Sequence, residues 1–164
     1  MRVPTIALTW LTILVLPCAA QFSNPAERGK ALRDRILRAL DHPALVEVSE
    51  HTSRFDQPFD SNFKERTLRT VQLNKQQIES LRLALPLSED RSGTVSQDCI
   101  FKEHHVITIR SKNGNVLTMH LCFECGELAL NKQNSRVMPD AWPESLAKFI
   151  GSIGMHPHGP WGKH

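Results

Sequence analysis

Apolar residues recur at helical spacing between residues 25 and 40. Apolar side chains stand at i, i+4, i+5 and i+8, the spacing of one face of an α-helix: Leu32, Ile36, Leu37 and Leu40. Asn24 and Pro25 precede them, and these residue types favour an N-cap and the first turn of a helix. The pattern predicts a helix from about residue 25, which ends at His42-Pro43.

Two strands and a second helix are predicted next. Residues 44–51 alternate, with Val46 and Val48 on one side, and residues 67–73 form another strand-like run. Asn74 is then followed three residues later by Gln77, the arrangement of a capping box. We therefore expect a helix that starts after Asn74 and continues through Leu81 towards Leu85.

A β-hairpin is predicted around Asn113-Gly114, which separates the apolar runs 106–111 and 116–123. This dipeptide favours a two-residue type I′ turn. In that register His105 lies opposite Cys122 and Ile107 lies opposite His120, so that the histidines and Cys122 share one face. The other face is then expected to form the core, through Val106, Thr108, Leu117, Met119, Leu121 and Phe123.

A further strand is expected at 127–131 and a last helix at about 143–153, where apolar residues return at helical spacing. The element order α-β-β-α-β-β-β-α predicts an α+β fold, with an antiparallel sheet of about five strands and helices packed on one face. One domain over residues 21–153 accommodates these elements. Residues 154–164 are rich in Gly, Pro and His, which predicts a disordered tail.

The N-terminal twenty residues have the pattern of an export signal. Arg2 is followed by an apolar run over residues 6–16, and Cys18-Ala19-Ala20 offers small residues for cleavage after Ala20. The run is too short for a membrane span of about 20 residues. The mature chain is thus expected to start at Gln21, in the periplasm or outside the cell, and lipid attachment at Cys18 is the alternative.

Charge gives little support to a nucleic-acid partner. The formal net charge is +3, too small for the electrostatic footprint of a nucleic-acid-binding protein. Basic residues do gather on the first helix, where Glu27, Asp34 and Asp41 are mixed among them: Arg28, Lys30, Arg33, Arg35 and Arg38. A solvated helix face is favoured there over a patch for an anionic partner.

Cys99, Cys122 and Cys125 remain in the mature chain, and an odd number cannot pair fully within one molecule. In an extended strand the Cα atoms of residues 122 and 125 lie roughly 10 Å apart, which is too far for a disulfide. Cys99 precedes the first hairpin strand and can approach the end of the second. The favoured interpretation is a Cys99–Cys125 disulfide with one buried free cysteine.

A metal site is a second interpretation of the same residues. Cys122-Phe-Glu-Cys125-Gly has the form of a zinc knuckle, and Cys99 with His105 could complete a tetrahedral set for zinc. His104 and His120 are further candidate ligands. The match is incomplete because a zinc ribbon contains a second C-x-x-C.

A thiol–disulfide redox site is a third interpretation of the C-x-x-C spacing. That chemistry depends on a thiolate at a helix N-terminus, whereas Cys122 follows a strand. Motifs of other enzymes, such as G-x-S-x-G and H-E-x-x-H, are absent from the sequence.

The segment from Cys99 through Leu121-Cys122-Phe123-x-Cys125 resembles a loosely defined group of small exported bacterial proteins with a C…CF-x-C pattern and a C-terminal helix. The resemblance covers residues 67–153 and implies no activity, but it implies that the three cysteines act together. We therefore expect an exported, non-catalytic binding or structural module with an unknown protein or small ligand as partner. Metal binding and redox exchange remain the alternatives.

Overall fold

The computed structural model describes residues 24–53, 55–56, 64–90 and 99–158. The expected signal peptide, its cleavage after Ala20 and the alternative at Cys18 lie outside these residues. Helix α1 (Pro25–Ala39) begins as predicted, because the Asn24 side chain accepts a hydrogen bond from the N–H of Ala26. It ends before His42, whose backbone has a positive φ of 79°.

Strand β1 (Pro43–His51) and strand β2 (Thr67–Gln72) follow, and they confirm the two predicted strands. Helix α2 (Lys75–Leu83) contains the predicted capping box. Asn74 Oδ1 accepts from the N–H of Gln77 at 2.9 Å, and Gln77 Oε1 accepts from the N–H of Asn74 at 3.0 Å. These reciprocal bonds satisfy two donors that a helix end leaves without a partner.

The second half of the chain forms β3 (His105–Ser111), β4 (Val116–Cys122), β5 (Glu127–Leu130), β6 (Arg136–Val137) and α3 (Trp142–Ser152). The strands make one antiparallel sheet in the order β2-β1-β3-β4-β5-β6. The α+β class is confirmed. The sheet has six strands among the described residues, compared with the expected number of about five. The additional strand is β6, which is only two residues long and was not predicted.

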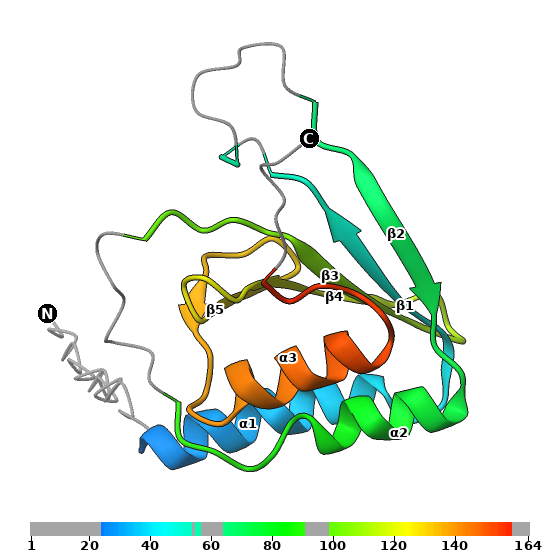
Figure 1. Ribbon diagram of the computed structural model, residues 1–164. Coiled ribbons are helices and arrows are strands. Elements are labelled where there is room, and N and C mark those ends of the chain that lie inside the picture. Colours follow the sequence, from blue (N-terminus) through cyan, green and yellow to red (C-terminus); the bar gives the residue numbers. More distant parts are fainter. Residues whose placement is uncertain (1–23, 54, 57–63, 91–98, 159–164) are drawn as a thin grey trace, which may run out of the picture.

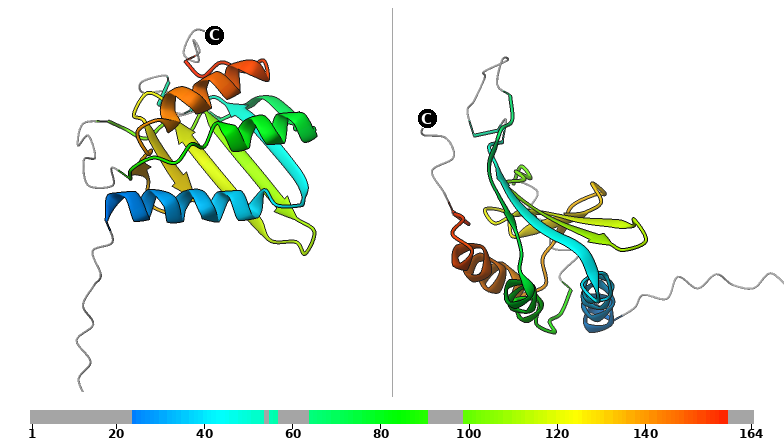
Figure 2. Two further views of the ribbon diagram at one scale, coloured as in Figure 1. Left: turned by 90° about the horizontal axis from the view of Figure 1, so that it is seen from below. Right: turned by 90° about the vertical axis from the view of Figure 1, so that its right-hand side faces the viewer.

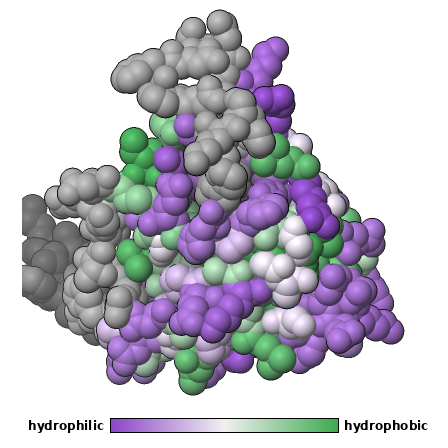
Figure 3. All heavy atoms as spheres, viewed as in Figure 1, coloured by the Kyte–Doolittle hydropathy of each residue, from purple (hydrophilic) through white to green (hydrophobic). Residues whose placement is uncertain are grey.

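All three helices lie on one side of the sheet, as Figures 1 and 2 show. Between the helices and the sheet lies a core in which the following side chains are at most 1% exposed: Ile36, Val46, Val48, Leu81, Leu85, Ile107, Ile109, Met119, Leu121, Leu128, Met138, Trp142, Leu146 and Ile150. Figure 3 shows hydrophilic and apolar residues interspersed on one face of the molecule, without a single broad apolar patch. None of the helices in the described residues is long and apolar enough to span a membrane.

The register of the β3–β4 hairpin differs by one residue from the prediction. His105 lies opposite Leu121 and Val106 lies opposite His120. The loop contains three residues rather than two, because Ser111 and Asn115 still pair through a 2.9 Å hydrogen bond and Gly114 alone has a positive φ, of 86°. A three-residue loop of this kind ends in a left-handed residue that closes a bulge.

The changed register turns β3 over relative to β4. Leu117, Met119 and Leu121 face the core as predicted, but on β3 the core residues are Ile107 and Ile109 instead of Val106 and Thr108. Since alternate residues of a strand point to opposite faces, His105 shares the helix-covered face with Ile107. Cys122 and His120 lie on the opposite, helix-free face.

Residues 154–158, which the composition assigns to a disordered tail, pack against the domain in the structure. Met155 is 3% exposed, and the carbonyl oxygen of Gly154 accepts a hydrogen bond from the Arg69 guanidinium. His156 Nδ1 lies 3.6 Å from Glu50 Oε1. The domain thus includes the start of this segment, and residues 159–164 lie outside the described residues.

Candidate functional site

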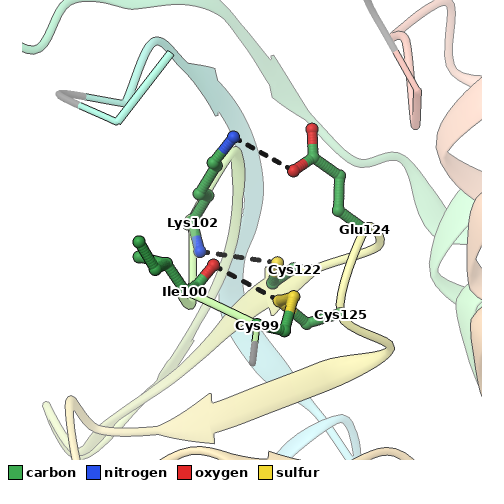
Figure 4. Close-up of a disulfide and its surroundings, with 6 residues drawn as sticks. All are labelled: Cys99, Ile100, Lys102, Cys122, Glu124 and Cys125. Carbon is green, nitrogen blue, oxygen red and sulfur yellow. Dashed lines mark hydrogen bonds and ion pairs between the residues drawn. A yellow bond between two sulfur atoms is a disulfide. The ribbon is translucent and has the colours of Figure 1, made fainter. Parts of the chain in front are cut away.

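Cys99 and Cys125 form a disulfide, the pairing favoured from the sequence (Figure 4). Their Cα atoms are 5.8 Å apart, which is within the range that a disulfide can bridge. Cys125 lies in the turn between β4 and β5, where Gly126 has a φ of 63°. The bond therefore ties this turn to the segment that leads into β3.

Cys122, the last residue of β4, is the remaining cysteine of the described residues and is fully buried. Its Sγ accepts a hydrogen bond from the N–H of Lys102 at 3.4 Å, and the ammonium of Lys102 pairs with Glu124 at 3.2 Å (Figure 4). Burial raises the pKa of the Cys122 thiol. A thiol in this state is a poor nucleophile and a poor metal ligand.

His105 is separated from Cys122 by the sheet itself, because the two residues lie on opposite faces. His105 is fully buried, and on the neighbouring strand β1 it lies opposite Glu50. Its ring meets the Phe123 ring edge-on, with 5.4 Å between the centroids. Burial, with a smaller contribution from His104, lowers the pKa of His105 to about 3. The imidazole is therefore neutral at physiological pH.

The four candidate ligands Cys99, His105, Cys122 and Cys125 are thus not assembled around one point. Two are consumed by the disulfide, and the other two face opposite ways. Across the described ranges of the chain, no group of three or more His, Cys, Asp or Glu side chains is arranged to hold a metal ion. A thiol in a disulfide cannot act as a thiolate ligand.

The helix-free face carries a polar cluster that the sequence did not predict as a unit. His120 Nδ1 is 2.6 Å from Glu103 Oε2 and its Nε2 is 3.1 Å from Thr118 Oγ1. The hydrogen bond between Glu103 and His120 is the main reason why the pKa of Glu103 is lowered. His120 is only 3% exposed, and its two ring nitrogens are both engaged.

His51 is held in a similar way on β1. Its Nε2 lies 2.7 Å from Ser49 Oγ and its Nδ1 lies 3.2 Å from Thr67 Oγ1. Burial lowers the pKa of His51. The pairs Ser49/His51 and Thr118/His120 are each two residues apart on a strand, and this spacing is the signal from which a shared face could have been predicted.

His104 completes the set of engaged imidazoles. It is 1% exposed, and its Nε2 lies 2.8 Å from Asp56 Oδ1, whose side chain is 4% exposed. Asp56 Oδ2 also accepts from the N–H of Ser53 at 2.7 Å. His104, His120 and Cys122 are therefore buried and held by neighbours, an arrangement that orients side chains and fixes the sheet to the segments beside it.

Comparison of the chain with protein-family models, with curated proteins and with solved structures gives no match.

Proposed function

We propose that this protein is an exported, non-catalytic binding module in which the cysteines and histidines stabilise the sheet instead of reacting. The observation that carries the proposal is the burial of the reactive groups: Cys122, His104, His105 and His120 are each at most 3% exposed. General base or nucleophilic chemistry needs these groups within hydrogen-bond reach of a substrate. Buried groups of this kind contribute to the packing of the fold and leave the exterior for binding.

The two alternatives receive less support from the geometry. Redox exchange needs a thiolate with a lowered pKa, whereas burial raises the pKa of Cys122. Metal binding needs the thiolates of Cys99 and Cys125, which are joined in the disulfide.

Export is proposed from the N-terminal pattern around residues 1–20. The disulfide supports it, because such bonds persist in oxidising compartments such as the periplasm and the extracellular medium. The proposal therefore places the mature chain, starting at Gln21, outside the cytoplasm.

One preparation tests the proposal. The full-length precursor is expressed in a bacterial host, and intact mass and thiol content are measured on the exported protein. We expect a chain that begins at Gln21, one free thiol per chain when the protein is denatured without reduction, and a peptide map that joins Cys99 to Cys125. Three free thiols with about one zinc per chain would overturn it in favour of a metal protein. A lipid on Cys18 would overturn the assignment of the start to Gln21 and place the protein on a membrane.

A further inference from the structure

A groove runs along helix α1 on the side that faces the β3–β4 turn. One part of it has a volume of about 380 Å³ and lies between α1 and the hairpin, whose turn is close to the C-terminal end of α1 in Figure 2. Two arginines of α1, Arg35 and Arg38, line it on one side. Asn113, Asn115 and Asn131 line it on the other.

A second hollow, of about 490 Å³, continues the first towards the N-terminal end of α1. It is lined by Arg28, Asp90 and the residues 134–136 before and in β6, and it shares Arg35 with the first hollow. Because a helix rises 1.5 Å per residue, the stretch of α1 from Arg28 to Ala39 makes the groove about 16 Å long. This length suits an extended segment of several residues better than a single small ion.

The positive charge in the groove is only partly offset by the protein itself, through Asp90 beside Arg28 and through the electrostatic interaction of Asp34 with Arg38. Arg28 pairs with Asp90 at 3.2 Å, but within the described part of the chain no side chain or carbonyl is hydrogen-bonded or ion-paired to the guanidinium of Arg35, Arg38 or Arg136. The other side of α1 differs, because Lys30 pairs with Asp34 and Arg33 donates to the carbonyl oxygen of Leu85 at 2.6 Å. Three arginines with available donors therefore face one groove.

The lining favours a carboxylate-bearing peptide. A guanidinium binds carboxylates through two parallel hydrogen bonds, and asparagine amides both donate and accept, as peptide groups do. Apolar contact is available from the exposed side chain of Val116, beside which the buried Ile109 and Leu117 also line the groove. The described lining residues include no aromatic ring, so the bases of a single-stranded nucleic acid would lack the stacking surface on which they usually bind.

We propose that this groove binds an extended acidic peptide segment of a partner protein, with carboxylates held by Arg35, Arg38 and Arg136. The inference rests on the proposed function as a binding module and names the surface and the class of partner. It also changes the interpretation of the basic residues on α1, which the sequence favoured as a simple solvated face.

Fluorescence anisotropy with a labelled peptide of alternating Glu and Ala tests the proposal on the mature protein. We expect saturable binding that weakens as salt rises, and no binding of the matching Gln–Ala peptide. Arg35→Gln and Arg38→Gln should each weaken binding by about 5- to 30-fold, the loss typical of a charge-assisted contact at a partly exposed site. Lys75→Gln is the control, because it removes one positive charge from an exposed position on α2 that does not line the groove, and it should change affinity by less than about twofold.

A charge exchange makes the test independent of any loss of fold. Arg35→Glu should weaken binding of the Glu–Ala peptide and gain binding of a Lys–Ala peptide, a result that an unfolded variant cannot give. Three outcomes would overturn the proposal: no saturable binding of the acidic peptide, equal weakening by Lys75→Gln, or Arg35-dependent binding of a single-stranded oligonucleotide in place of the peptide. The thiol count and intact mass test the proposed function separately, so a failure of the groove and a failure of the module can be distinguished.

Discussion

In the cysteine and histidine region, the face of the sheet on which a residue lies determines its neighbours and its ionisation. His105 points into the helix-covered core, while Cys122 and His120 point to the helix-free face, where the segment 100–104 contacts them. A group that is buried in its neutral form resists ionisation, since the low-dielectric surroundings disfavour charge. The pKa of His105 is therefore lower, and the pKa of Cys122 higher, than the pKa of the same group in an exposed position.

Cys122 should react slowly with an alkylating agent in the folded protein. Its thiol is fully buried, and burial raises its pKa, so little accessible thiolate is present near neutral pH. We expect alkylation at pH 7.5 to be more than about tenfold slower than in denaturant, as followed by mass spectrometry of the unreduced protein. Equal rates in both states would contradict the buried position.

His105 should make the fold sensitive to acid. In the unfolded chain an imidazole takes up a proton as the pH falls through about 6.5, but the folded protein resists protonation until about pH 3. The unfolded state binds more protons over this window, so the free energy of unfolding should fall with decreasing pH between these values. The total loss from this group is on the order of 5 kcal/mol, and it is complete below the lower value.

The substitution His105→Phe tests this assignment. It keeps an aromatic ring beside Phe123 but removes the titrating group, so the loss of stability between pH 6.5 and 3 should become shallower. Part of the slope should remain, because burial also lowers the pKa of His51. Denaturant unfolding at several pH values measures both proteins, and identical slopes would show that His105 is not the responsible group.

At the scale of elements, the β3–β4 turn depends on one backbone conformation. Gly114 has a φ of 86°, and nothing lies within 4 Å of the position where its Cβ would be. The substitution Gly114→Val should therefore destabilise the fold through backbone strain alone, by about 1 to 3 kcal/mol. Lys112→Val, in the same exposed turn but without a positive φ, should cost much less. Equal denaturant midpoints for wild type and Gly114→Val would contradict this turn geometry.

Local signals in the sequence predicted the elements well. Asn24, Asn74 and Gln77 marked helix starts because capping depends only on residues within one turn. The strand pattern around Val46 and Val48 was similarly local. The hairpin register could not be predicted in this way, because Asn113-Gly114 is compatible with both a two-residue and a three-residue loop, and one residue of difference exchanges the faces.

The candidate site was predicted only in part. The Cys99–Cys125 pairing followed from strand geometry, which excluded a bond between Cys122 and Cys125. The polar cluster of Glu103, Thr118 and His120 joins the lead-in to β3 with β4, and the α1 groove joins a helix with a distant turn. Such sites depend on tertiary contacts, and nothing in the local sequence specifies which segments meet.

At the scale of the whole molecule, the disulfide joins the segment that leads into the β3–β4 hairpin to the turn that follows the hairpin. It connects two residues separated by 26 positions and fixes the segment before β3 to the β4–β5 turn, beside which Lys102 contacts Cys122 (Figure 4). Glu103 and His104 in the same segment are held by His120 and Asp56. A covalent link of this kind stabilises mainly because it restricts the unfolded chain. The link should therefore contribute to global stability and not only to the local turn.

Removing the disulfide should lower the free energy of unfolding by about 3 to 4 kcal/mol, the chain-entropy expectation for a loop of this size. The double variant Cys99→Ala/Cys125→Ala measures this by denaturant unfolding, and reduced wild type should unfold at a similar midpoint. Cys122→Ala should keep the response to reductant, because the disulfide remains in that variant. A chelator should alter none of these midpoints, since the stability arises from a covalent bond. A chelator-dependent midpoint in the reduced wild type, absent from the double variant, would instead show that the same cysteines hold a metal.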